Sequence, residues 1–80
     1  VYIGEEVIIE PDVEIHQNTV IKGKSTLEKS CVIGPCSFLE NSTVSTEAIL
    51  QGHNILVNAI IPEHHILHFG SQIIEETQYE

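Results

Sequence analysis

Histidines are the residues of this 80-residue chain whose side chains are best suited to chemistry. A neutral imidazole near pH 7 can act as a general base on a hydroxyl or an amine. Three imidazole nitrogens around an open water position can instead hold zinc. None of the histidines stands in a recognisable catalytic motif, so a corner or surface position is the alternative for each. The histidines are His16, His53, His64, His65 and His68.

The two cysteines are also candidates for redox or metal chemistry. Cys31 and Cys36 are five residues apart and do not form a C-x-x-C pair. Cys31 falls where the chain repeatedly places a small inward residue, which favours a buried, reduced thiol over a redox or metal role. Asn41, Ser42 and Thr43 match a glycosylation sequon, but no secretion signal accompanies them. These features together predict a reducing, cytoplasmic setting.

Charge and composition exclude several classes of partner. The formal net charge is −9, and the cations are Lys22, Lys24 and Lys29, with no arginine. Nucleic acids and anionic membrane surfaces are bound through clustered Lys and Arg, so neither is expected as a partner. No apolar run approaches the ~20 residues of a membrane span. The chain also lacks methionine, which leads us to expect a processed chain or a piece of a longer one.

The elements that must position these residues follow a short repeat. An aliphatic residue returns at every sixth position from Ile3 to Leu39, and four residues after each comes a small or β-branched one. A fixed short period of this kind predicts a β-helix, in which each hexad forms one side of a coil. The aliphatic residues are Ile3, Ile9, Ile15, Ile21, Leu27, Ile33 and Leu39. The small ones are Val7, Val13, Thr19, Ser25, Cys31, Ser37 and Thr43.

Three hexads would close a triangular coil, which stacks the aliphatic residues in three columns. After residue 44 the repeat continues with partners seventeen instead of eighteen residues apart, as one shortened corner per coil would produce. We therefore predict a β-helix domain over residues 1–74, regular over 3–44 and less regular over 45–74, with an acidic tail at 75–80. The columns are Ile3-Ile21-Leu39-Leu56-Ile73, Ile9-Leu27-Val44-Ile61 and Ile15-Ile33-Leu50-Leu67.

The small-residue column continues less cleanly in the second half. Ser71 and Thr77 suit it, whereas Asn54 and His65 are larger and more polar than the position prefers. Each of these two must therefore find a hydrogen-bond partner or turn outward. Between the aliphatic residues, Gly, Pro, Asn and charged residues mark solvent-facing corners.

These hexads resemble those of the hexapeptide-repeat transferases, whose fold is a left-handed parallel β-helix. Within that group the first half is similar to the start of the C-terminal domain of the bacterial bifunctional N-acetylglucosamine-1-phosphate uridyltransferase/glucosamine-1-phosphate acetyltransferases. The residues that carry this resemblance are Tyr2-Ile3, Asp12-Val13-Glu14-Ile15, Asn18-Thr19-Val20-Ile21, Cys31-Val32-Ile33-Gly34-Pro35 and Ser37.

The resemblance implies a parent enzyme of UDP-N-acetylglucosamine and cell-wall synthesis, which would bind sugar phosphate, nucleotide, acetyl-CoA and Mg. It implies that this segment is the scaffold and homotrimerisation element of that transferase. The Gly-rich nucleotide loop and the later His, Lys and Arg stretch of the family are not present in these 80 residues. We accordingly expect no catalytic, cofactor-binding or metal residue here. His16, Lys22 and Glu28 also depart from the Gly or Asp that usually follows the aliphatic residue.

Two alternatives of a different class stay open. One is a self-contained hexapeptide acyltransferase, with His53 or one histidine of the His64-His65-His68 cluster as its base. The other is a zinc enzyme similar to the γ-class carbonic anhydrases, which bind zinc through three histidines across a trimer interface. His16, His53 and the His64/His68 pair offer loosely similar ligands, although the spacing of the later pair does not match. A third possibility is an inert repeat module used for assembly.

Overall fold

The structure, a computed structural model, describes residues 1–74 as short parallel strands in three sheets. Sheet A holds β1 (Tyr2–Ile3), β4 (Val20–Lys22), β7 (Phe38–Glu40), β10 (Ile55–Val57) and β13 (Gln72–Ile74). Sheet B holds β2 (Ile8–Ile9), β5 (Thr26–Leu27), β8 (Thr43–Val44) and β11 (Ile60–Ile61). Sheet C holds β3 (Glu14–Ile15), β6 (Val32–Ile33), β9 (Ile49–Leu50) and β12 (Ile66–Leu67). The chain is thus an all-β parallel β-helix, and the predicted fold class is confirmed.

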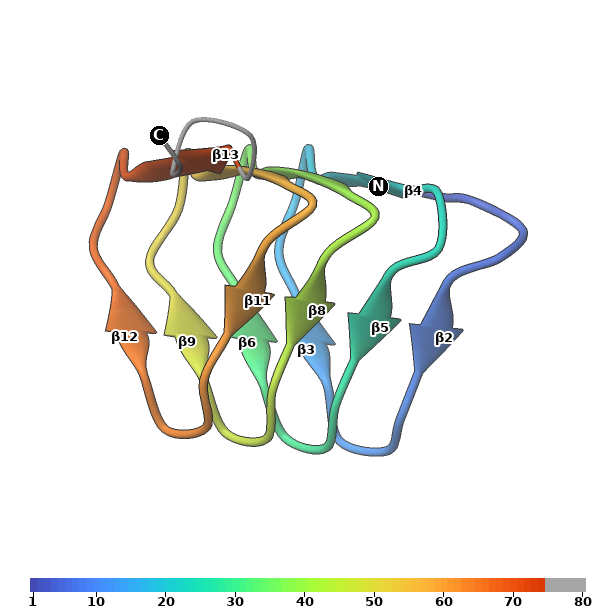
Figure 1. The fold of residues 1–80 in the computed structure, drawn as a ribbon, viewed down its shortest axis with the longest axis horizontal. Coiled ribbons are helices and arrows are strands. Elements are labelled where there is room, and N and C mark those ends of the chain that lie inside the picture. The colour runs from blue at the N-terminus through green and yellow to red at the C-terminus, as the bar shows by residue number, and fades with distance from the viewer. Residues whose placement is uncertain (75–80) are drawn as a thin grey trace.

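The strands stack coil upon coil, as Figure 1 shows, with sheet A along the top and sheets B and C below it. Four coils, residues 2–19, 20–37, 38–54 and 55–71, are followed by β13, so the prediction of a little over four coils holds. The register pairs Ile21 with Leu39, Leu27 with Val44 and Ile33 with Leu50. All three predicted aliphatic columns are confirmed by the strand pairing.

The core is a thin column of aliphatic side chains shared between coils. Ile21, Leu27, Ile33, Leu39 and Leu50 are all fully buried. Each contributes about 1.5–3 kcal/mol to stability by leaving water. The first coil has no coil before it in these 80 residues, so its inward residues Ile3 and Ile9 stay 42% and 40% exposed.

The small-residue column lies two residues before each aliphatic one, and one of its predicted members is wrong. Ser42 is fully buried, whereas Thr43 lies in β8 and is only partly buried. Counting four residues on from Leu39 gives Thr43, but the corner after β7 is one residue shorter than the corner after β4. The inward small residue is therefore Ser42, and the irregularity begins before residue 44. Ser71 is partly buried, and the predicted Thr77 lies outside the described residues.

Asn54 points into the core, whereas His65 is exposed to solvent. Asn54 is fully buried, and its Oδ1 accepts a hydrogen bond from the Gly52 N–H at 3.0 Å. Its Nδ2 donates to the carbonyl oxygens of His68 and Ser71 at 2.8 and 3.0 Å. Every polar atom of this buried amide is therefore satisfied, as burial requires. His65 is exposed instead.

The corners between sheets are named here by the sheets they join. Corner AB consists of residues 4–7, 23–25, 41–42 and 58–59; corner BC of 10–13, 28–31, 45–48 and 62–65; corner CA of 16–19, 34–37, 51–54 and 68–71. The missing residue of the later coils falls in corner AB, at 41–42 and 58–59. The shortened corner predicted from the seventeen-residue spacing is confirmed.

Every coil has corner residues other than glycine that adopt positive φ. Cys36, Glu47 and His53 have φ of 59°, 60° and 52°, a region that costs most residues energy. Each donates its N–H to a carbonyl of the preceding coil: Cys36 to Gln17, Glu47 to Lys29 and His53 to Pro35, at 3.0, 3.0 and 2.8 Å. These inter-coil hydrogen bonds hold the corners, and they direct the corner side chains outward.

Candidate functional site

The three corners carry different charges. In every coil corner BC presents carboxylates, and a single lysine, Lys29, lies among them. Corner CA contains no Asp, Glu, Lys or Arg residue. Corner AB is mixed, with Glu5, Glu6 and Lys24. The carboxylates of corner BC are Glu10, Asp12, Glu28, Glu47 and Glu63, and the histidines of corner CA are His16, His53 and His68.

The outer face of sheet C lies between these two contrasting corners. Its strands present an apolar row, Val32, Ile49 and Ile66, which pair in register from coil to coil. Ile49 and Ile66 are 37% and 48% exposed, although their neighbours Leu50 and Leu67 are buried. Sheet B also presents outward isoleucines, Ile8 and Ile60, which are 60% and 74% exposed, so exposed apolar side chains are not confined to sheet C.

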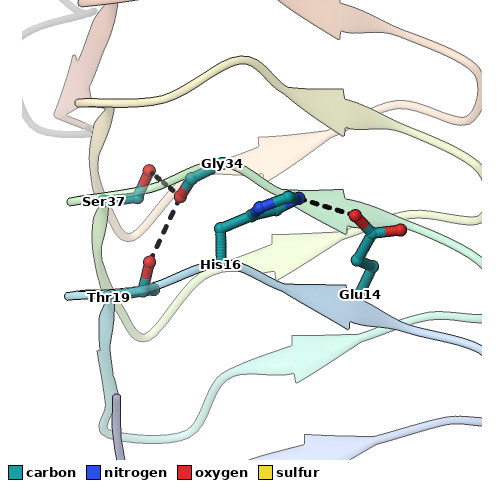
Figure 2. Close-up of polar contacts among 5 residues, drawn as sticks. All are labelled: Glu14, His16, Thr19, Gly34 and Ser37. Atoms are coloured by element: carbon teal, nitrogen blue, oxygen red, sulfur yellow. Dashed lines mark hydrogen bonds and ion pairs between the residues drawn. The ribbon is translucent and has the colours of Figure 1, made fainter.

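Gly34 organises corner CA at the edge of this face. Its carbonyl oxygen accepts hydrogen bonds from Thr19 Oγ1 at 3.2 Å and Ser37 Oγ at 3.0 Å, as Figure 2 shows. A Cβ at Gly34 would lie 2.5 Å from the backbone carbonyl of Gln51 and 2.6 Å from the Gly52 nitrogen. The next coil thus passes against Gly34 so closely that a side chain does not fit.

Two histidine side chains lie within contact distance of nearby carboxylates. The Nε2 of His16 lies 2.6 Å from the Glu14 carboxylate on β3, on the outer face of sheet C (Figure 2). The Nδ1 of His64 lies 3.0 Å from the Glu47 carboxylate in corner BC. A carboxylate can orient an imidazole and support it as a base. Within residues 1–74 neither histidine–carboxylate contact includes a nucleophile or a second base, so neither forms a complete catalytic arrangement.

The remaining histidines do not gather into a site within one chain. His53 packs against Phe69, with ring centroids 4.7 Å apart and an interplanar angle of 43°. His65 and His68 are exposed. Among residues 1–74, no group of three or more His, Cys, Asp or Glu side chains is arranged to hold a metal ion. Within a single chain the structure therefore does not bring the proposed zinc ligands together.

A hollow of about 380 Å³ lies beside corner AB at the start of the stack. It is lined by Tyr2, Gly4, Glu5, Glu6, Lys22 and Gly23. The Lys22 ammonium is placed over the Phe38 ring, 5.9 Å from its centroid. Because carboxylates and an ammonium share the lining, its charge selects neither anions nor cations.

The two cysteines differ in burial, and this gives a testable difference in reactivity. Cys31 is fully buried and Cys36 is exposed, both as free thiols. Burial, with smaller contributions from Glu28 and Glu10, raises the pKa of Cys31 from 9.0 to about 11. Because the thiolate is the reactive form, Cys31 is expected to resist alkylation in the folded protein.

At pH 8 we expect a maleimide to modify Cys36 rapidly and Cys31 only after denaturation, as mass spectrometry would measure. Rapid double labelling of the folded chain would contradict this, and Cys36→Ser is the control that should abolish fast labelling. The raised pKa also predicts that Cys31 supports folding fully below pH 9.0 and loses that contribution as pH rises toward about 11, since the unfolded thiol ionises first.

Sequence reasoning missed the carboxylate partners of His16 and His64 and the outward apolar row of sheet C. Glu14 stands two residues before His16, which in a strand places both side chains on one face. Ile49 and Ile66 are seventeen residues apart, and each directly precedes a member of an aliphatic column. Reading the position before each column residue would have found this row.

The comparisons with known proteins agree with one another. The chain is 42% identical over 50 residues to the bifunctional protein GlmU of Exiguobacterium sp.. The aligned stretch covers 62% of this chain and 11% of that protein. It is 34% identical over 59 residues to the protein of the same name from Clostridium acetobutylicum, 74% of this chain and 13% of that one. For Acholeplasma laidlawii the identity is 32% over 61 residues, 76% of this chain and 13% of the relative.

The chain thus spans only 11 to 13% of the length of these curated relatives. No family model matches it. No solved structure matches it significantly. Among the described residues, no helix is long and apolar enough to cross a membrane.

The repeating hexads, the three parallel sheets and the stacked coils define a hexapeptide-repeat parallel β-helix. This is the class expected from the resemblance to the hexapeptide-repeat transferases. Within it, the chain is similar to the bifunctional proteins GlmU and fits the start of their C-terminal β-helix domain.

Proposed function

We propose that this chain is the scaffold and trimerisation segment of a GlmU-like sugar-nucleotide transferase and carries no complete active site of its own. The observation that carries the proposal is the similarity to several proteins GlmU, which reaches 76% of this chain. The inter-coil register supports it, because the matched sequence forms a continuous stack of coils. The complete protein would bind sugar phosphate, nucleotide, acetyl-CoA and Mg, and would act in the cytoplasm in cell-wall precursor synthesis.

The positions of the buried and the exposed residues support a scaffold role. Ile33, Leu39 and Gly34 are buried and fix the stack, whereas the histidines lie mostly at the surface. β1, β2 and β3 are the edge strands at the start of the three sheets, and within residues 1–74 no further strand pairs with their outer edges. A second chain or further coils can therefore continue the same hydrogen-bonding pattern.

Light scattering of the purified 80-residue chain tests the trimerisation element. We expect a particle of three times the 8.9 kDa chain mass. A monomer at all concentrations up to the millimolar range would overturn the trimer.

A chimera tests the family assignment itself. The stretch of this chain that matches the Exiguobacterium sp. GlmU would replace the corresponding stretch of that protein, and uridyl transfer and acetyl transfer would be assayed separately. Both activities are expected to survive, because the segment supplies a coil stack and not reacting groups. Loss of acetyl transfer with an intact trimer would overturn the assignment of a purely structural role.

A further inference from the structure

Five of the four-residue corners close on themselves through one backbone hydrogen bond. The N–H of the last corner residue donates to the carbonyl oxygen three residues earlier, which closes a β-turn. Val7 donates in this way to Gly4 at 3.4 Å, and Ala48 to Ser45 at 3.1 Å. The other three turns join Cys31 to Glu28, His65 to Pro62 and Ser71 to His68, at 3.3, 3.3 and 3.1 Å.

The shortened corners of coils 3 and 4 satisfy this N–H in a different way. Corner AB consists there of 41–42 and 58–59, so the carbonyl three residues before Ser42 or Ala59 already belongs to β7 or β10. The Ser42 N–H donates instead to the Ser25 Oγ of the coil before, at 3.1 Å. The Ala59 N–H donates to the Ser42 Oγ at 3.2 Å. A side-chain oxygen of one coil thus takes the place of a turn in the next.

Each of these hydroxyls accepts a hydrogen bond while donating its own proton elsewhere. The Ser25 Oγ donates to the Lys22 carbonyl and the Ser42 Oγ to the Glu40 carbonyl, both at 2.9 Å. Ser25 and Ser42 are fully buried, so water does not reach the N–H groups that they receive. Because a buried N–H needs a partner, the two short corners depend on these two oxygens.

Corner AB is longer in coil 2, where the coil before offers no hydroxyl. Val7 occupies the position below Ser25, and its side chain has no acceptor. The corner there has three residues, 23–25. The N–H of Lys24, which has no counterpart in the shorter corners, donates to the Asn41 Oδ1 at 2.8 Å. The length of corner AB therefore follows the residue type in the coil before it.

We propose that the inward hydroxyl of corner AB is a length-setting device, in which a serine in one coil permits the next coil to omit one corner residue. Ser25 would then set the length of coil 3, and Ser42 that of coil 4. This accounts for the place where the spacing changes: Ile21 and Leu39 pair eighteen residues apart, whereas Leu27 and Val44 pair seventeen apart. The device depends on the coil stack alone, so the trimer and the family assignment can fail without affecting it.

Replacing Ser42 with alanine should leave the Ala59 N–H buried without its acceptor. Amide hydrogen exchange of the 80-residue chain, followed by NMR, measures this loss. We expect the Ala59 amide to exchange about tenfold faster relative to the Ala48 amide, because Ala48 is held by a turn within its own corner. Ser45→Ala is the matched control, since the Ser45 hydroxyl has no hydrogen-bond partner among residues 1–74. Equal acceleration of both amides in Ser42→Ala would contradict the proposal.

One inserted glycine distinguishes a length-setting hydroxyl from one that only adds stability. Placed between Asn58 and Ala59, it gives coil 4 the three-residue corner that coil 2 has above Val7. In the parent chain the insertion should lower the midpoint of thermal unfolding, because Ser42 already supplies the acceptor. In Ser42→Ala the insertion should raise the midpoint, because the longer corner no longer needs the hydroxyl.

The two changes must therefore be non-additive. Additive losses would mean that Ser42 stabilises the stack without setting its period, and the proposal would be overturned. If Ser42→Ala alone does not fold, the inserted glycine should restore a folded chain by circular dichroism. A double variant that also fails to fold would overturn the proposal as well.

Discussion

Replacing Ile33 with lysine is expected to unfold the β-helix. Ile33 is fully buried in the middle of its column, in register with Ile15 before it and Leu50 after it. The substitution removes about 1.5–3 kcal/mol of burial and adds an ammonium with no partner in the core, which costs several kcal/mol more. The free energy of unfolding should fall by more than about 4 kcal/mol, a large part of the stability of a small domain.

Urea unfolding followed by circular dichroism measures this change, with Glu14→Lys as the comparison. The Glu14 side chain is 62% exposed and forms the pair with His16. Losing an exposed pair costs at most about 1 kcal/mol, so the midpoint of that variant should stay close to that of the parent chain. Similar midpoints for the two variants would contradict the register in which Ile33 points inward and Glu14 outward.

The aliphatic columns could be predicted from the sequence because the interior of a coil stack accepts few residue types. Every inward position is covered by the coils before and after it, so Leu39 and Leu56 must both be apolar and must pair. The same reasoning located the seventeen-residue coils. It misplaced Thr43 because the shortening occurs at 41–42, in a corner whose length is fixed by backbone hydrogen bonds and not by the aliphatic period.

The outer surface could be predicted much less well. An outward position of a strand tolerates many residue types. The two-residue spacing places Glu14 and His16 on one face, but it does not show that they touch, and no spacing rule pairs His53 with Phe69. These contacts depend on side-chain rotamers: Glu14 and His16 are two residues apart, and His53 and Phe69 are sixteen residues apart, in successive coils. The sequence therefore did not determine which groups each histidine contacts. Their positions at corners and on the surface, in contrast, follow from the stacking of the coils.

Replacing Gly34 with alanine is expected to destabilise the chain far more than one methyl group would suggest. The added Cβ would lie 2.5 Å from the carbonyl of Gln51 and 2.6 Å from the nitrogen of Gly52, and both are backbone atoms. They cannot move without separating coil 3 from coil 2, where the Gly34 N–H donates to the Leu50 carbonyl at 2.8 Å. Overpacking of this kind costs about 1–3 kcal/mol, and we expect the upper end of that range.

Gly4→Ala is the matched control, because Gly4 directly follows Ile3 just as Gly34 follows Ile33. A Cβ at Gly4 would meet its nearest neighbour, the Lys22 Cα, at 3.4 Å, which is near ordinary contact. Thermal unfolding of both variants should therefore lower the midpoint strongly for Gly34 and little for Gly4. Equal midpoints would mean that the coils can spread at corner CA, and the close passage of Gln51 over Gly34 would then not be what fixes the edge of the sheet C face.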